Sequence, residues 1–160
     1  MSAEYFIQLP GITGESEKDG HKDQIDVSSW SWGVSQSSTA SSGSGSGSGK
    51  ATPSDFQFTK PFDSASCNLA KSCAAGDHLK ELKMTARKAG GTQQDYIIIT
   101  LEEVLITSFH TGGSEGAFPF DQVTCSYKKI KIEYKVQKGT GDSGASKNVT
   151  WDIKAGKAQN

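Results

Sequence analysis

Apolar and polar residues alternate along most of the chain, and a period of two residues is typical of β-strands. The clearest example lies near the C-terminus, where lysine and glutamate separate four apolar residues: Ile130, Ile132, Tyr134 and Val136. The same alternation predicts strands at residues 5–9, 25–35, 56–59, 79–88, 123–136 and 149–153. A further strand is predicted at residues 96–108, whose centre, YIIITL, is apolar on both faces and therefore suits the middle of a sheet or contact with another subunit. We therefore expect a mainly β protein of seven or eight strands.

The second of these strands has two very different faces. Alternation places Trp30, Trp32 and Val34 on one face. An indole needs burial because it offers a large apolar area, so this face should point into a core. The opposite face holds only small residues and suits close approach to another surface: Ser29, Ser31, Gly33 and Ser35.

A low-complexity segment follows that strand. Residues 35–49 contain eight serines and four glycines, and no core can be built from such a composition. We expect a long extended loop over residues 35–50. Two interpretations stay open for it: a tolerated flexible loop, or an arm that becomes ordered when it meets a partner.

Only one segment has clear helical spacing. Ala65, Leu69 and Cys73 recur at intervals of four residues, so they share one side of a helix. Asp63 precedes them as an N-cap residue, and Gly76 stands where a C′ glycine is common. We predict one short α-helix at residues 64–75.

Length and composition limit the architecture. The chain has 160 residues, 18 of them glycine, and a hydrophobic fraction of 34%, which suits one turn-rich β domain spanning residues 1–160. Many short strands in one domain form a barrel or two packed sheets. We predict a two-sheet β barrel with one short helix.

Charge and chemistry exclude several function classes. A formal net charge of −1 indicates no general attraction to nucleic acid, and no apolar run is long enough for membrane insertion. The first residues lack the pattern of a secretory signal, so we expect synthesis in the cytoplasm. Three cysteines without metal-ligand spacing predict free thiols. Scattered histidines and the lack of a nucleophile motif indicate no metal, no cofactor and no catalytic residues.

Several stretches, taken in order, resemble the Hcp (haemolysin-coregulated protein) family of type VI secretion. They span nearly the whole chain, and their order and spacing carry the resemblance, because none is a catalytic signature. They are YFIQLPGITGES, GHKDQIDVSSWSWGVSQ, FTK followed by the predicted helix, RKAGG, IIITLEEVLITS and TGGS.

This resemblance implies a structural role. Subunits of the family close into hexameric rings, and the rings stack into the inner tube of the type VI secretion system. A contractile sheath drives the tube out of the cell behind a spike protein, and small effector proteins travel protected in the ring lumen. The implied partners are therefore other copies of the chain, sheath and spike proteins, and effectors. The implied localisation is cytoplasmic before assembly and secreted afterwards, without a cleaved signal peptide.

A different class of function stays open beside this one. A monomeric, lectin-like ligand-binding β domain without catalytic activity would also use such strands, and its serine-rich loop would then be a linker. The mass in native solution separates the two classes, since only the first predicts six chains in one particle.

The candidate residues follow from the ring. The small-residue face can line its hole, which makes Ser29 and Ser31 candidate effector contacts; alternatively, Ser31 packs on a neighbouring subunit or faces water. In the family, the loop after the tryptophan strand reaches a neighbouring ring. That implies a second set of candidates for contact between rings: Ser38, Thr39, Ser41, Ser42 and Lys50.

Overall fold

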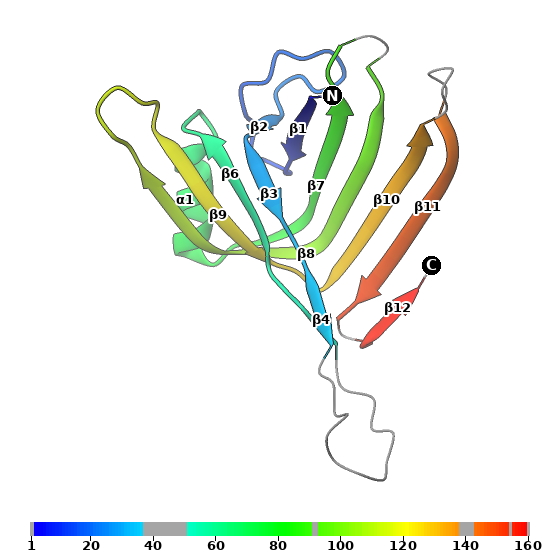
Figure 1. Ribbon diagram of the computed structural model, residues 1–160. Coiled ribbons are helices and arrows are strands. Elements are labelled where there is room, and N and C mark those ends of the chain that lie inside the picture. The colour runs from blue at the N-terminus through cyan, green and yellow to red at the C-terminus, as the bar shows by residue number, and fades with distance from the viewer. Residues whose placement is uncertain (1, 37–50, 91–92, 138–142, 154, 160) are drawn as a thin grey trace.

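The computed structural model describes residues 2–36, 51–90, 93–137, 143–153 and 155–159, and these form twelve strands and one helix (Figure 1). The mainly β prediction is confirmed. The helix is α1 (Ser66–Ala75). The strands are β1 (Ala3–Gln8), β2 (Ile25–Val27), β3 (Ser29–Ser31), β4 (Val34–Gln36), β5 (Ala51–Pro53), β6 (Phe56–Pro61), β7 (His78–Lys88), β8 (Asp95–Gly112), β9 (Phe120–Ser126), β10 (Lys129–Gln137), β11 (Ser143–Asp152) and β12 (Lys157–Gln159).

The architecture is organised around β8, which has 18 residues. Its N-terminal part pairs antiparallel with β7 on one side and β10 on the other, and its C-terminal part pairs with β9. One sheet therefore runs β12-β11-β10-β8-β7-β1-β2, and a second runs β3-β6-β9 and joins the first at β8 (Figure 1). Among the described residues, no ladder joins the ends of these sheets into a closed barrel.

The core fills the angle between the two sheets. Strand alternation turns one side chain in two toward it, and most of these are large and apolar. Trp30 packs on the core with its ring 6.2 Å from that of Phe56 and 6.1 Å from that of Tyr5. The most deeply buried apolar side chains include Phe56, Phe58, Leu69, Leu82, Met84, Ile99 and Leu101.

Residues 25–35 form three short strands rather than the single strand expected. The chain changes partner twice: β2 pairs with β1, β3 with β6, and β4 with β5. Each change of partner interrupts the ladder of backbone hydrogen bonds, because the three partner strands lie on different paths and the backbone must turn to follow them. The expected faces survive in part, since Trp30 and Trp32 are half-buried, whereas Val34 is exposed.

Residues 123–136 were expected as one strand and form two, β9 and β10. The buried positions are odd-numbered from Asp121 to Tyr127, whereas the next buried position is Ile130, followed by the half-buried Ile132, so the alternation changes phase in between. Tyr127 stays buried because its hydroxyl group accepts a hydrogen bond from Trp32 Nε1 and donates one to Ser54 O at 2.8 Å. The chain turns there, and β10 pairs with the other end of β8.

The helix begins at Ser66, two residues later than expected. Asp63 does not cap it directly; its Oδ1 accepts a hydrogen bond from the Ala65 amide at 2.9 Å. Gly76 ends the helix in the left-handed conformation, with φ of 65°, as expected. Leu69 anchors the helix in the core. No helix in the described residues is long and apolar enough to cross a membrane.

A buried ion network joins this helix to the sheet. Lys60, on β6, is fully buried, and its Nζ lies 2.8 Å from Asp121 Oδ2 and 2.7 Å from Asp63 Oδ1. The same Nζ donates to Ser66 Oγ at 2.9 Å, and Ser66 Oγ donates to Asp121 Oδ2 at 2.5 Å. Lys60 and Asp121 compensate each other's buried charge, and Ser66 adds a hydrogen bond to Asp121 Oδ2, whereas Asp121 Oδ1 is buried without a hydrogen-bond partner.

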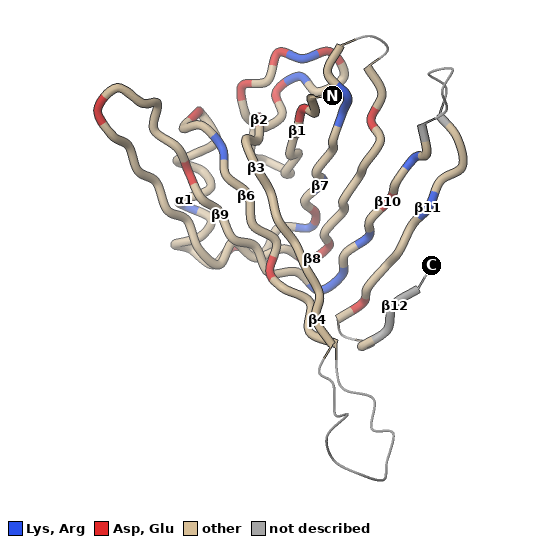
Figure 2. The backbone as a smooth tube through the Cα atoms, viewed as in Figure 1, with Lys and Arg blue, Asp and Glu red and all other residues tan. Residues whose placement is uncertain are grey.

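Alternation along residues 79–88 predicts that Leu82, Met84 and Ala86 face the core and that Lys83, Thr85 and Arg87 face water. The structure confirms these faces of β7 on one side only. Leu82, Met84 and Ala86 are fully buried, as expected. Thr85 and Arg87 were expected to face water and are buried, so that expectation was wrong. The loop between β1 and β2, rich in charged residues, covers this side of the sheet (Figure 2).

The cover is held by specific contacts of Arg87. Its Nη2 lies 2.9 Å from Glu4 Oε2, and its Nη1 donates to Asp19 O in the loop at 2.7 Å. The guanidinium group also lies 5.2 Å from the ring centre of Phe6. His21 stacks on Phe6 at 4.2 Å, and its Nε2 lies 2.8 Å from Asp95 Oδ1. The loop is thus fixed to three strands.

Candidate functional site

A hollowed surface of about 330 Å³ lies on the second sheet, on the side away from the core. The register aligns its side chains in rows across four strands: Ser31 is opposite Gln57, and Gln57 is opposite Thr124. We call this surface the polar face and define it by Ser29, Ser31, Gln57, Thr59, Ser108, His110, Gln122 and Thr124.

The polar face is fixed by the residues that alternate with it. Phe56, Phe58, Val123 and Cys125 point the other way and are buried, so a slip of one residue would expose all of them. Burial also raises the pKa of the Cys125 thiol to about 12, which keeps it protonated. The position of the polar face is therefore determined by the core behind it.

The chemistry of the polar face is unusual for an exposed sheet. Its eight defining residues are hydroxyl and amide side chains and one histidine, without lysine, arginine, aspartate or glutamate. Serine and threonine hydroxyls and glutamine amides both donate and accept hydrogen bonds. Such a surface can contact many polypeptides without demanding a complementary charge.

Both small-residue candidates lie on this surface. Ser29 and Ser31 are exposed, and Ser29 Oγ lies 2.5 Å from Thr59 Oγ1. Sequence reasoning did not find the other members of the face. Alternation in β6 and β9 could have located Gln57, Thr59, Gln122 and Thr124, but not the pairing of these strands. The candidates Ser38, Thr39, Ser41, Ser42 and Lys50 lie outside the described residues.

The tryptophan beside the polar face is held by a hydrogen-bonded chain. Trp32 Nε1 donates to the Tyr127 hydroxyl, which donates to the backbone of Ser54. Burial raises the pKa of Tyr127, so the hydroxyl stays protonated and able to donate. These two hydrogen bonds fix the point after β3 at which the backbone leaves the second sheet.

A second surface is an apolar groove of about 260 Å³ between the start of β4 and the strands β10 and β11. The register places Ile130 opposite Trp151 and Ile132 opposite Val149. Sequence alternation predicted that Val149 and Trp151 share a face, but not that this face stays partly open. We call it the tryptophan groove and define it by Trp32, Val34, Ile130, Ile132, Val149 and Trp151.

The three histidines lie in different parts of the described structure. His21, in the covering loop, is hydrogen-bonded to Asp95 at the start of β8. His78 begins β7, and His110 lies on the polar face. No three histidine, cysteine, aspartate or glutamate residues in the described part of the chain converge to hold a metal. Cys67, Cys73 and Cys125 are free thiols, as expected.

Comparison with known proteins decides the family. A family model described as "Type VI secretion system effector, Hcp" matches residues 6–134. Protein hcp1 of Pseudomonas aeruginosa is 46% identical over 157 residues, which is 96% of this chain and 97% of that protein. The chain belongs to the Hcp family of type VI secretion proteins. This family is one of structural tube proteins, and the resemblance recognised in the sequence is confirmed.

Solved structures agree with this assignment to Hcp. A structure described as a type six secretion system protein superimposes with a TM-score of 0.92 at 26% identity, covering 99% of this chain and all of the other. Hcp1 from Salmonella typhimurium superimposes with a TM-score of 0.83 at 32% identity, with 99% and 100% coverage. The two-sheet fold of this Hcp chain is thus shared with its relatives.

Proposed function

We propose that this Hcp chain closes into hexameric rings that stack into the inner tube of a type VI secretion system. The rings carry and protect small effector proteins in their lumen and are exported with them. The chain is made in the cytoplasm, and its partners are other copies of itself, the sheath, the spike protein and the effectors. The protein has no enzymatic role in this process.

The uncharged polar face is the observation that carries the proposal. It is hollowed, built from hydroxyl and amide side chains and one histidine, and backed by a buried core, which suits the wall of a channel that must accept different cargo. Ser31 contacts that cargo, because it is exposed near one edge of the face and its position is fixed by Trp30 and Trp32 on the other side of the strand.

The edges of the polar face support closure into a ring. Among the described residues, β3 has β6 as its one partner strand, and the end of β8 beyond Ile106 has only β9. Both edges of the face therefore present backbone donors and acceptors that another strand can satisfy. A neighbouring subunit on each side of the face would pair with the open edges of both β3 and β8.

The native mass tests the ring. We expect native mass spectrometry of the full chain to give a particle of six times the chain mass of 17.0 kDa. A clean monomer at tens of micromolar would contradict the ring and favour a monomeric ligand-binding domain.

Ser31→Gln tests the role of the polar face. The longer side chain projects from an exposed position, so we expect rings to form as before while co-purified effector falls by about tenfold, the result of losing roughly 1.4 kcal/mol of binding free energy. The measurement is quantitative mass spectrometry of the small proteins that co-purify with the ring. Ser35→Gln is the matched control, because Ser35 is exposed on β4 and outside the polar face.

The two ways in which Ser31→Gln could fail have different meanings. Loss of the ring in this variant would place Ser31 at a subunit interface. An unchanged yield of effector would place Ser31 away from the cargo and leave the ring proposal intact.

A further inference from the structure

The tip of the β8–β9 hairpin carries an apolar projection. The side chain of Phe118 is 91% exposed, and Phe62 and Phe120 beside it are each 47% exposed. The Phe62 amide donates to Pro119 O at 3.0 Å, which ties the backbone after β6 to the residue between Phe118 and Phe120. We call this patch the phenylalanine knob. Exposed aromatic patches of this kind mark surfaces that bind other proteins.

The knob is held on a defined turn. The Ala117 amide donates to Ser114 O at 3.1 Å, and Gly116 has a φ of 82°, which favours glycine. Gly113 lies against Pro119, since a Cβ there would be 3.6 Å from the proline ring. Phe118 is therefore presented by ordered backbone, and little conformational entropy would be lost when it docks.

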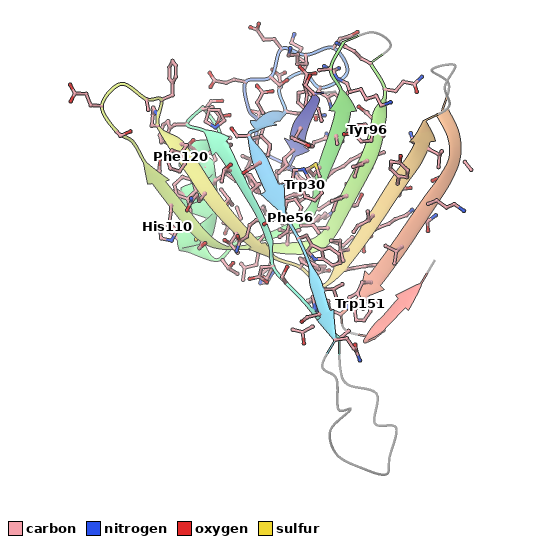
Figure 3. All side chains as sticks on the ribbon, in the orientation of Figure 1. Trp30, Phe56, Tyr96, His110, Phe120 and Trp151 are labelled. Carbon is pink, nitrogen blue, oxygen red and sulfur yellow. The ribbon has the colours of Figure 1, made fainter. Side chains whose placement is uncertain are left out.

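The tryptophan groove has the shape and polarity that such a projection needs. It is concave and lined by six apolar side chains, one of which, Val34, is 53% exposed. The knob cannot reach the groove of its own chain, because Phe120 and Trp151 lie at opposite ends of the molecule (Figure 3). Any knob in the groove must come from another molecule.

We propose that the phenylalanine knob of one copy docks in the tryptophan groove of a second copy of this chain. The inference rests on the self-assembly proposed above and names one of the contacts between copies. Neither surface contains a charged side chain among its defining residues, so docking buries apolar area without burying an unpaired charge.

The charges around the two surfaces are complementary. Glu115 lies at the hairpin tip, three residues before Phe118. Lys147 is exposed on β11, on the same face as Val149 and Trp151, because these residues are two positions apart along the strand. Figure 2 shows the acidic tip on one side of the molecule and, on the other, basic residues along β10 and β11 with an acidic position at the end of β11. A second copy therefore brings the acid toward the base as the knob enters the groove.

The contact is head to tail, because knob and groove are different surfaces. Repetition of such a contact gives either a closed ring or an extended stack. It uses side chains of the knob and the groove, whereas closure through the open strand edges uses backbone groups of β3 and β8. A ring closed through the strand edges can therefore form even without this contact, and the two proposals can fail separately.

Photo-cross-linking tests the contact directly. We place p-benzoylphenylalanine at position 118 of the full chain, irradiate it, and map the product by peptide mass spectrometry. We expect a cross-link between chains into the segment that contains Val149 and Trp151. The same probe at Lys80, an exposed position outside both surfaces, should give no product in that segment.

Charge reversal in the same assay tests the orientation. Lys147→Glu should lower the yield by about two- to fivefold, as expected for an exposed ion pair, and adding Glu115→Lys should restore it. Cross-links that map elsewhere, or no product between chains, would overturn the inference. Native mass measured on the same samples shows separately whether the ring forms.

Discussion

Replacing Lys60 by methionine is expected to lower the free energy of unfolding by about 3–5 kcal/mol, the usual cost of breaking a buried ion pair. The cation is fully buried and lies 2.8 Å from a carboxylate oxygen of Asp121 and 2.7 Å from one of Asp63. Without it, Asp121 keeps its bond from Ser66, but its charge is left uncompensated in the core. Urea unfolding monitored by circular dichroism measures the loss.

Two further variants separate the buried pair from a general effect of losing a lysine. Lys128→Met removes an exposed partner 3.4 Å from Glu103 and should cost less than about 1 kcal/mol. Lys60→Met combined with Asp121→Leu should be more stable than Lys60→Met alone, because both buried charges are then absent. Equal losses for Lys60→Met and Lys128→Met would contradict this account of the network.

The second large effect is expected for Arg87→Met, which should lower the free energy of unfolding by about 2–3 kcal/mol. The variant removes hydrogen bonds to Glu4 and to the backbone of Asp19, and with them the attachment of the covering loop. Lys18→Met is the matched control. It removes a mostly exposed cation 3.0 Å from the same carboxylate and should cost less than about 1 kcal/mol.

The ion pair of Arg87 with Glu4 predicts that the stability of the fold depends on pH. Hydrogen bonds from Arg87 and then Lys18 hold the pKa of Glu4 below its ordinary value of 4.5. A carboxyl with a lowered pKa stabilises the fold above its unfolded pKa, and this contribution is lost as the pH falls through the folded value. The difference in stability between wild type and Arg87→Met should therefore narrow below pH 4.5. A constant difference down to acid denaturation would show that Glu4 is not the titrating partner.

Alternation in the sequence was sufficient to predict most of the core and one edge of the candidate site. It placed Leu82, Met84 and Ala86 inside, and it turned Ser29 and Ser31 outward. Applied strictly, it would also have placed Lys60 inside, since that residue continues the row of Phe56 and Phe58. The change of phase between Tyr127 and Ile130 was likewise a visible sign that one long strand was in fact two.

Other features depend on distant parts of the chain and could not be read from local pattern. Arg87 has the spacing of a solvent-facing residue, but it is covered by a distant loop. Asp19 in that loop, which accepts a hydrogen bond from Arg87, lies 68 residues earlier in the chain. The polar face needs the pairing of β3, β6, β9 and β8, which no local period encodes. The tryptophan groove could not be predicted either, because alternation shows which side chains share a face but not how completely that face is covered.

The pairing of β1 has a consequence for how the chain folds as it is synthesised. β1 lies between β2 and β7, and Gln8 at its end pairs with Lys83. At roughly 5–20 residues per second, the ribosome takes about 4–16 seconds to make the 80 or so residues that separate β1 from the end of β7. During that time Phe6 and Ile7 lack the strand that later buries them. Long-range pairing also slows folding itself, so the newly made N-terminal strand stays open to chaperones and proteases until β7 has been made and paired with it.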